Sequence, residues 1–172
     1  MAKNIVLSLF GIAYSWIFAV SIPFYIADWD SGPFPPRMGA ISIIAWLLMI
    51  LGGCVFIWCY GLFIFIGRGT PWPFDPPKRL VVAGPYRFVR NPMGASFLLI
   101  VMGEALLFGS ISLLLYWLAG FALLHTREVL IAEPALKKRF GLPYEHYFKS
   151  VPRWIPRLSP YMEEGTDLPG KE

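Results

Sequence analysis

The sequence predicts an all-α integral membrane protein with about four transmembrane helices, the last two paired as a helical hairpin, and a C-terminal amphipathic cytoplasmic helical segment. Hydrophobic residues make up 56% of the 172 residues and the mean hydropathy is +0.57, whereas soluble domains are less apolar. Two long stretches also lack any charge. The length suits one domain, which we expect at residues 1–158, followed by a polar tail at 159–172.

The two uncharged stretches are the first two predicted spans, at about 5–27 and 38–66. They contain 23 and 29 residues, and a helix needs about 20 to cross a bilayer. A cleaved signal peptide is the alternative for the first stretch. Its length and Pro23 near its end favour a retained span.

A third apolar region, residues 93–125, is interrupted at Phe108-Gly109-Ser110. It is too long for one crossing, so we expect a tight hairpin of two short spans at about 92–108 and 111–125. Asn91 is a favoured cap residue and Pro92 a favoured first helical residue, which together predict where the first of these spans begins.

Basic residues indicate the orientation of the spans. Residues 68–91 contain five Lys or Arg and residues 126–157 contain seven, whereas the loop between the first two spans contains only Arg37. Four spans place both basic segments on one face, which the positive-inside rule makes cytoplasmic. We therefore expect a multi-pass protein of the cell inner membrane with both termini cytoplasmic. Contact with anionic membrane lipids accounts for the net charge of +4, so no nucleic-acid partner is predicted.

The segment after Thr126 mixes charged and apolar residues at helical spacing. It predicts an amphipathic helix that leaves the last span, lies near the interface and ends at Gly141. Pro134 predicts a kink or a new helical start within it. A second short helix is expected at 143–150.

The turn "GPYRFVRNPMG", residues 84–94, is a candidate anion site. A helix that begins at Asn91-Pro92 directs backbone N–H groups towards the cytoplasm, and Arg87 and Arg90 flank it. The alternative is that the arginines only reach lipid phosphates.

Glu104 is a second candidate, because it is the one charged residue within the hairpin. An ionisable group at this depth is costly unless it has a partner or faces a polar cavity. The alternative is a protonated carboxyl group bonded to a neighbouring helix. Cys54 and Cys59 lie five residues apart in the second span without nearby His or Cys partners, and no metal site is predicted.

The basic turn and the segment 127–157 converge on the same predicted face, so an active site is expected between them. The residues there that carry charge or a polar ring are Arg90, Asn91, His125, Glu128, Glu133 and Tyr144. Such a site suits a water-soluble charged cofactor that meets an apolar substrate. If it exists, Arg90 and Asn91 must share a cavity that reaches Glu133.

Two motifs carry a resemblance to a known family. "GPYRFVRNPM", followed by a helical hairpin and then by "AEPALKKRFGLPYEHYFKSVPRWIPR", resembles the isoprenylcysteine carboxyl methyltransferases and their bacterial phospholipid-methyltransferase-like relatives. That family has a G-x-Y-x-x-x-R-[HN]-P turn and, further on, E-E-x-x-L-x-x-x-F-G-x-x-Y-x-x-Y. The second pattern is met here by Glu133, Leu136, Phe140, Gly141, Tyr144 and Tyr147. The resemblance covers residues 68–157, about half of the chain.

The resemblance implies that S-adenosylmethionine binds on the cytoplasmic side and that its methyl group passes to a lipophilic acceptor. The implied cofactor-binding residues are Gly84, Pro85, Tyr86, Arg87, Arg90, Asn91, Pro92, His125, Glu128, Glu133 and Tyr144. We expect the carboxylate of the cofactor at Arg90 and Asn91, its ribose or amino group at Glu133, and its sulfonium at Tyr86 or Tyr144. The candidate catalytic residues are Arg90, Glu133 and Glu104. The acceptor is expected to enter from the bilayer between the hairpin and the second span.

The chain departs from the family pattern at two places. The first Glu of the E-E pair is Ala132, and Gly94 and Ser96 replace the Tyr and Gly that usually follow the R-[HN]-P turn. Glu128 is a candidate substitute for the missing carboxylate.

Two other classes of function stay open at this point. One is an NADPH-dependent membrane reductase of the sterol-reductase type, which would call for more Arg and Lys. The other is a non-catalytic membrane scaffold, which the Ala132 departure favours. The sequence does not name the acceptor, which is an isoprenylcysteine carboxylate, a phospholipid amine or a small apolar acid or thiol. It also leaves open whether Gly52-Gly53 packs against a helix of the same chain or of a second copy.

Overall fold

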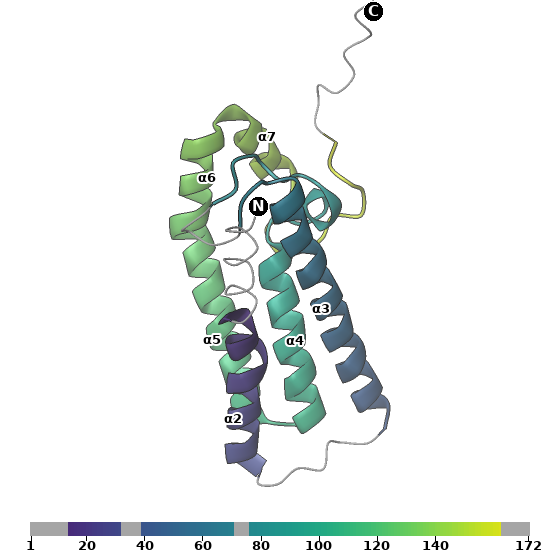
Figure 1. Cartoon of the computed structure of the whole chain (residues 1–172). Helices are drawn as coiled ribbons and strands as arrows, with labels where there is room; N and C mark the ends of the chain where they lie inside the picture. The colour runs from purple at the N-terminus through teal and green to yellow at the C-terminus, as the bar shows by residue number, and fades with distance from the viewer. Residues whose placement is uncertain (1–13, 32–38, 71–75, 163–172) are drawn as a thin grey trace, which may run out of the picture.

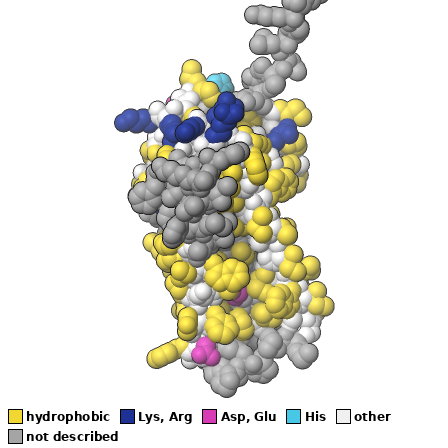
Figure 2. Space-filling view, in the orientation of Figure 1, with side chains coloured by type: hydrophobic (Ala, Val, Ile, Leu, Met, Phe, Trp, Pro, Cys, Tyr) yellow, Lys and Arg dark blue, Asp and Glu magenta, His cyan; other side chains and the backbone are white. Residues whose placement is uncertain are grey.

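A computed structural model describes residues 14–31, 39–70 and 76–162, and this part of the chain contains helices but no strand (Figure 1). In chain order, the elements are the π-helical turn η1 (Ile17–Ser21), α2 (Ile22–Ser31), α3 (Ala40–Phe65), the 3₁₀ turn η2 (Gly84–Arg87), α4 (Pro92–Phe108), α5 (Ile111–Arg127), the π-helical turn η3 (Glu128–Ala132), α6 (Glu133–Phe140) and α7 (Leu142–Ser150). Helices α2, α3, α4 and α5 run side by side, and α7 caps one end of the bundle (Figure 1). We call this the polar end, because it carries the turn at 84–91 and most of the visible Lys and Arg side chains (Figure 2).

Within the described part of the chain, two helices are long and apolar enough to cross a membrane. They are α3, with 26 residues, and the continuous run Ile111–Phe140, with 30; α4 is apolar but has only 17 residues. Ile43, Leu47 and Ile57 of α3 are largely exposed, which suits contact with lipid and not with water. The prediction of an all-helical membrane protein is thus supported, while four spans and their orientation stay predictions.

Helices α3 and α4 pack closely through small residues. Ala45, Gly52 and Cys59 lie seven residues apart on α3, and all three are buried. A Cβ atom at Gly52 would lie 2.7 Å from the carbonyl oxygen of Ser96, and one at Gly103 would lie 2.7 Å from that of Ala45. Small residues allow backbones to approach, and a seven-residue repeat keeps them on one seam. Gly52 therefore packs within the chain, whereas Gly53 has no atom near its Cβ position.

The helical hairpin and its caps agree with the prediction. Gly109 adopts a left-handed conformation with φ of +63°, and the Ser110 side chain accepts a hydrogen bond of 3.1 Å from the Leu113 N–H group to cap α5. Asn91 caps α4 by accepting from the N–H group of Gly94 at 3.0 Å, and Pro92 is the first helical residue.

The amphipathic segment is helical and ends before Gly141 as predicted, while its position near the interface stays a prediction. It continues directly from α5, so that α5, η3 and α6 form one long helix (Figure 1). Pro134 has no backbone N–H group and so cannot donate a hydrogen bond to the preceding turn of the helix. The wider π-helical turn η3 before it accommodates this missing bond, and the helix continues past the proline. The turn η1 stands in the same relation to Pro23. The short helix predicted at 143–150 is α7.

Some predictions concern residues that the structure does not describe. They are the start of the first span at residues 5–13, the loop between the first two spans with Arg37, and the polar tail beyond Met162.

The α3–α4 seam predicts a large effect of added volume. Gly103→Leu should lower the free energy of unfolding by about 1–3 kcal/mol or more. The new side chain would overlap the backbone of α3 at Ala45, which can give way only if the whole helix shifts. Unfolding by SDS titration in mixed micelles measures this. Gly53→Leu is the matched control, and it should leave stability within about 0.5 kcal/mol. Equal losses in the two variants would contradict the assignment of the seam.

Candidate functional site

A buried carboxylate joins three separate segments at the polar end. Glu133, the first residue of α6, is 5% exposed. It accepts a hydrogen bond from Arg90 Nη1 at 2.7 Å and a two-pronged pair from Arg153, Nε at 2.7 Å and Nη2 at 2.8 Å. Such forked arginine–carboxylate pairs are strong and directional. Hydrogen bonding to Glu133 raises the pKa of Arg153. The Arg153 side chain therefore stays positively charged.

The turn at 84–91 is also bound to residues 151–162, which we call the strap. Arg90 Nε donates to the carbonyl oxygen of Val151 at 2.7 Å. The backbone N–H groups of Arg90 and Asn91 donate to the carbonyl oxygens of Pro152 and Arg153 at 2.8 and 3.2 Å. The Arg90 guanidinium carbon lies 4.0 Å from the centre of the Phe148 ring. Arg90 is therefore fixed from several sides.

Three buried tyrosines pack beneath this junction. Tyr147 donates a hydrogen bond of 2.7 Å from its hydroxyl group to the carbonyl oxygen of Tyr86. Burial raises the pKa of Tyr144 to about 12 and also raises the pKa of Tyr86 and Tyr147. All three hydroxyl groups consequently stay protonated at neutral pH.

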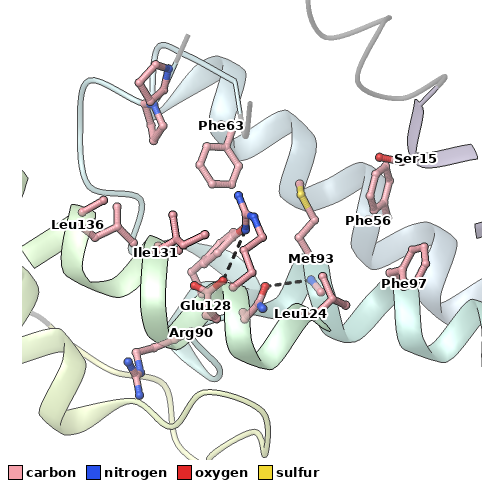
Figure 3. A pocket seen from close by; sticks show the side chains of 18 of the residues that line it. Ser15, Phe56, Phe63, Arg90, Met93, Phe97, Leu124, Glu128, Ile131 and Leu136 are labelled. Atoms are coloured by element: carbon pink, nitrogen blue, oxygen red, sulfur yellow. Dashed lines mark hydrogen bonds and ion pairs between the residues drawn. The ribbon is translucent and has the colours of Figure 1, made fainter. Parts of the chain in front are cut away.

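A cavity of about 530 Å³ opens beside this junction, and we call it the polar cavity. Figure 3 shows Phe63 and Met93 on one side of it and Glu128 and Ile131 on the other. The charged side chains among its described lining residues are Arg90, Arg127, Glu128 and Arg139. It can therefore meet both an anionic and a cationic group of one ligand.

Glu128 is the carboxylate of the polar cavity among the described residues. Its side chain is 14% exposed and lies 3.8 Å from Arg127 Nη1. Burial raises the pKa of Glu128, although Arg127 opposes this effect. The Glu133 N–H group bonds to the Glu128 carbonyl oxygen across η3. Residues five apart point about 140° apart in a regular α-helix, and the wider turn brings these two carboxylates closer in direction.

A second cavity of about 540 Å³ lies deeper in the bundle, and we call it the apolar cavity. Residues 14–18, the beginning of α4 and the helix α5 enclose it, with Tyr60 of α3. The residues that line both cavities are Ser15, Met93, Phe97, Leu124 and Arg127. The two cavities therefore adjoin along one side of α5. Residues of α3, α4 and α5 all line this cavity. The expected entry of the acceptor between the hairpin and the second span stays a prediction.

The structure brings several of the predicted site residues together. Tyr86, Arg90, Asn91 and Glu128 line the polar cavity. Glu133 and Tyr144 lie behind Arg90 and do not line it; Tyr144 borders a small neighbouring cavity of about 60 Å³. Arg90 and Asn91 thus share a cavity as expected, but Glu133 reaches it only through Arg90.

Other predicted residues shape the turn. Gly84 has φ of +54°, and a Cβ atom there would lie 3.1 Å from the Trp58 ring, so glycine suits this position. Pro85 is the second residue of η2, and Pro92 is the first residue of α4. Arg87 donates from Nε to the carbonyl oxygen of Tyr161 at 2.8 Å, which binds it to the strap.

Two predicted residues lie away from the polar cavity. His125 Nδ1 accepts a hydrogen bond of 3.1 Å from Trp154 Nε1, which holds the strap against α5. Glu104 follows Asn91 by 13 residues, about 20 Å along α4, and lines none of the described cavities. Glu104 is 6% exposed, and its Oε2 atom has no hydrogen-bond partner within the described part of the chain.

Sequence reasoning did not single out Arg127, Arg139 or Arg153, because it counted them only as positive charges on one face. The spacing of Leu124, Glu128 and Ile131 did contain a signal for the cavity-lining face of this helix. The three residues repeat at helical spacing and so share one face, and all three line the polar cavity.

These features define a class: a helical membrane protein with a charged cavity at its polar end that adjoins an apolar one. The chain matches the family model described as phospholipid methyltransferase over residues 40–142. This is more than half of its length, so the chain belongs to that family and is, by class, a membrane methyltransferase. Among curated proteins, no match is found.

The Glu133 junction predicts a large loss of stability on removing one partner. Arg153→Ala should lower the free energy of unfolding by about 3 kcal/mol, because it leaves buried Glu133 with one partner and removes one contact of the strap. Lys149→Ala removes an exposed cation nearby and should cost under about 0.5 kcal/mol. SDS titration compares the two. If Arg153→Ala matches Lys149→Ala, the junction does not stabilise the fold.

Proposed function

We propose that this protein transfers the methyl group of S-adenosylmethionine to a lipophilic acceptor. The observation that carries the proposal is the pair of adjoining cavities in a chain of this family: one has charges of both signs and the other is apolar. This division suits a soluble, charged methyl donor and an acceptor that stays in the bilayer.

The residues of the polar cavity fit the charged groups of the donor. Arg90 and Arg139 are cations for its carboxylate, and Glu128 is an acceptor for its ammonium group. The Tyr86 ring is suited to a sulfonium ion by cation–π attraction. Glu133 is already bonded to two arginines, so we assign it the role of a positioning residue for Arg90 and assign the donor contact to Glu128.

The dipole of α4 favours an anion near the N-terminus of this helix. The N–H groups of Gly94 and Ala95 are already bonded to the side chain and carbonyl group of Asn91. A carboxylate near this end would consequently be stabilised by the helix dipole and by Arg90, with no need for those amides.

The cofactor supplies an electrophilic methyl group, so the protein need only position and shield the two reactants. Arg90 is held by Glu133 and Val151, which fixes the orientation of the bound donor. The apolar walls at Met93, Phe97 and Leu124 exclude water where the cavities adjoin.

Both departures from the family pattern bear on the polar cavity. Gly94 and Ala132 line it, so the smaller residues leave space where the family pattern has larger ones. Glu128 supplies the carboxylate that Ala132 lacks. We further propose that the polar end faces the cytoplasm of the cell inner membrane, since it carries the basic segments and the donor is cytoplasmic.

Calorimetric titration tests the donor assignment. The protein in nanodiscs should bind S-adenosylmethionine, and Glu128→Gln should weaken binding by about tenfold, because it removes a charged partner worth about 1.5 kcal/mol. Glu145→Gln, an exposed matched control on α7, should bind as the wild type does. Binding of NADPH without S-adenosylmethionine would favour a reductase, and binding of neither would favour a scaffold.

The raised pKa of Glu128 predicts how donor binding depends on pH. Only the carboxylate form pairs with an ammonium group, so affinity should be full above the pKa of Glu128 and fall as pH drops through it. Because burial raises this pKa, the loss should begin at a higher pH than it would for an exposed Glu. Titrations from pH 8 to pH 5 measure it. A Glu128→Gln variant that kept the same pH dependence would assign the effect to another group.

A further inference from the structure

We propose that the apolar cavity binds the hydrocarbon part of an acceptor whose nucleophile is an anion, a carboxylate or a thiolate, and that Arg127 selects this anion over a cationic amine. The inference rests on the proposed function, because it names the class of acceptor that the same pair of cavities would take. It narrows the acceptors that the sequence left open.

The first step is the position of Arg127. It is the last residue of α5 and lines both cavities. Its side chain is 53% exposed, and its contact with Glu128 is long, at 3.8 Å. The pair is therefore weak, and the guanidinium group remains able to bind a ligand where the cavities adjoin.

The second step is the composition of the apolar cavity. Rings line much of it, including Phe18, Phe97 and Tyr116, and Arg127 is the charged side chain among its described lining residues. Apolar walls lower the local dielectric, so the sign of that charge matters more there than in water. An ammonium group would be repelled at Arg127, and a carboxylate or thiolate would be attracted and kept ionised.

The third step is the absence of a base for an amine. An amine must lose a proton before it can attack a methyl group, and the described residues of the apolar cavity include no carboxylate or imidazole. The nearest candidate, Glu128, lines the polar cavity instead and faces Arg127. We assign it to the ammonium group of the donor, which leaves no base for the acceptor.

An anionic acceptor needs no such base. A lone pair on its oxygen or sulfur attacks the methyl carbon, and a new O–C or S–C bond forms. The bond between that carbon and the sulfonium sulfur breaks, and its electron pair stays on the sulfur as a neutral thioether. The positive charge of the donor and the negative charge of the acceptor cancel, and no proton moves. Arg127 would hold the anion and release the neutral product more readily, since the charge attraction ends.

Three probes with one chain length test the selection. Tritiated decanoate, decylamine and decanol are bound to the full-length protein in nanodiscs of zwitterionic phosphatidylcholine near pH 7, with uptake by empty nanodiscs subtracted. Decanoate should bind about tenfold more tightly than decylamine. Arg127→Gln should bring the two within about twofold of each other, because only the charge term is lost. Lys138→Gln removes an exposed cation outside both cavities and should keep the wild-type ratio.

A second pair of variants tests the location. Gly120 lines the apolar cavity but not the polar one, and a Cβ atom there would lie 3.8 Å from the Phe97 ring, which is ordinary van der Waals contact. Gly120→Leu should weaken all three probes by about tenfold or more, because its side chain occupies the cavity. Gly53→Leu adds the same volume to an open surface and should leave binding unchanged. Equal binding of decylamine and decanoate by the wild type, or no effect of Gly120→Leu, would overturn the inference.

The test of the acceptor class can fail or succeed independently of the proposed function. S-adenosylmethionine binding is measured on the same samples by calorimetry. If decanoate is selected but the donor does not bind, the proposed function fails and the anion-selective cavity stands. If the donor binds and decylamine is preferred, the function stands and the acceptor class is wrong.

Discussion

The polar end of this protein depends on one buried carboxylate placed between two arginines. Glu133 bonds to Arg90 of the turn at 84–91 and to Arg153 of the strap, so three segments far apart in the sequence meet at one point. Burying a charge is costly unless its partners satisfy it, and both carboxylate oxygens are satisfied here. The arrangement directs Arg90 along one side of the polar cavity and leaves Glu128 as the carboxylate among the described residues that line it.

The close seam between α3 and α4 decides where a cavity can form. Gly52 and Gly103 bring the two backbones together, which leaves no space between them for a lipophilic molecule. The α5 side is different, because the residues around Leu124 and Arg127 stand away from the beginning of α4 and enclose both cavities. Close packing on one side of α4 and open space on the other place the polar and apolar cavities on the α5 side.

The π-helical turn η3 connects the long apolar helix to the charged junction. It lets the helix continue past Pro134, and it alters the relative direction of Glu128 and Glu133. The wider turn brings the two carboxylates closer in direction, yet Glu128 lines the polar cavity and Glu133 does not, because Arg90 and Arg153 bind Glu133 behind it.

The helices could be predicted from local signals, since Asn91 and Pro92 begin α4, Gly109 and Ser110 form the hairpin turn, and Gly141 ends α6. The sequence also indicated the convergence of the turn and the C-terminal region, because two basic segments separated by a hairpin fall on one face. The direction of each polar side chain, in contrast, depends on the tertiary fold. Glu133 turned to Arg153, His125 to Trp154, and Arg127 to the place where the cavities adjoin. Such choices depend on partners distant in the chain and on how closely helices pack, and neither follows from local spacing.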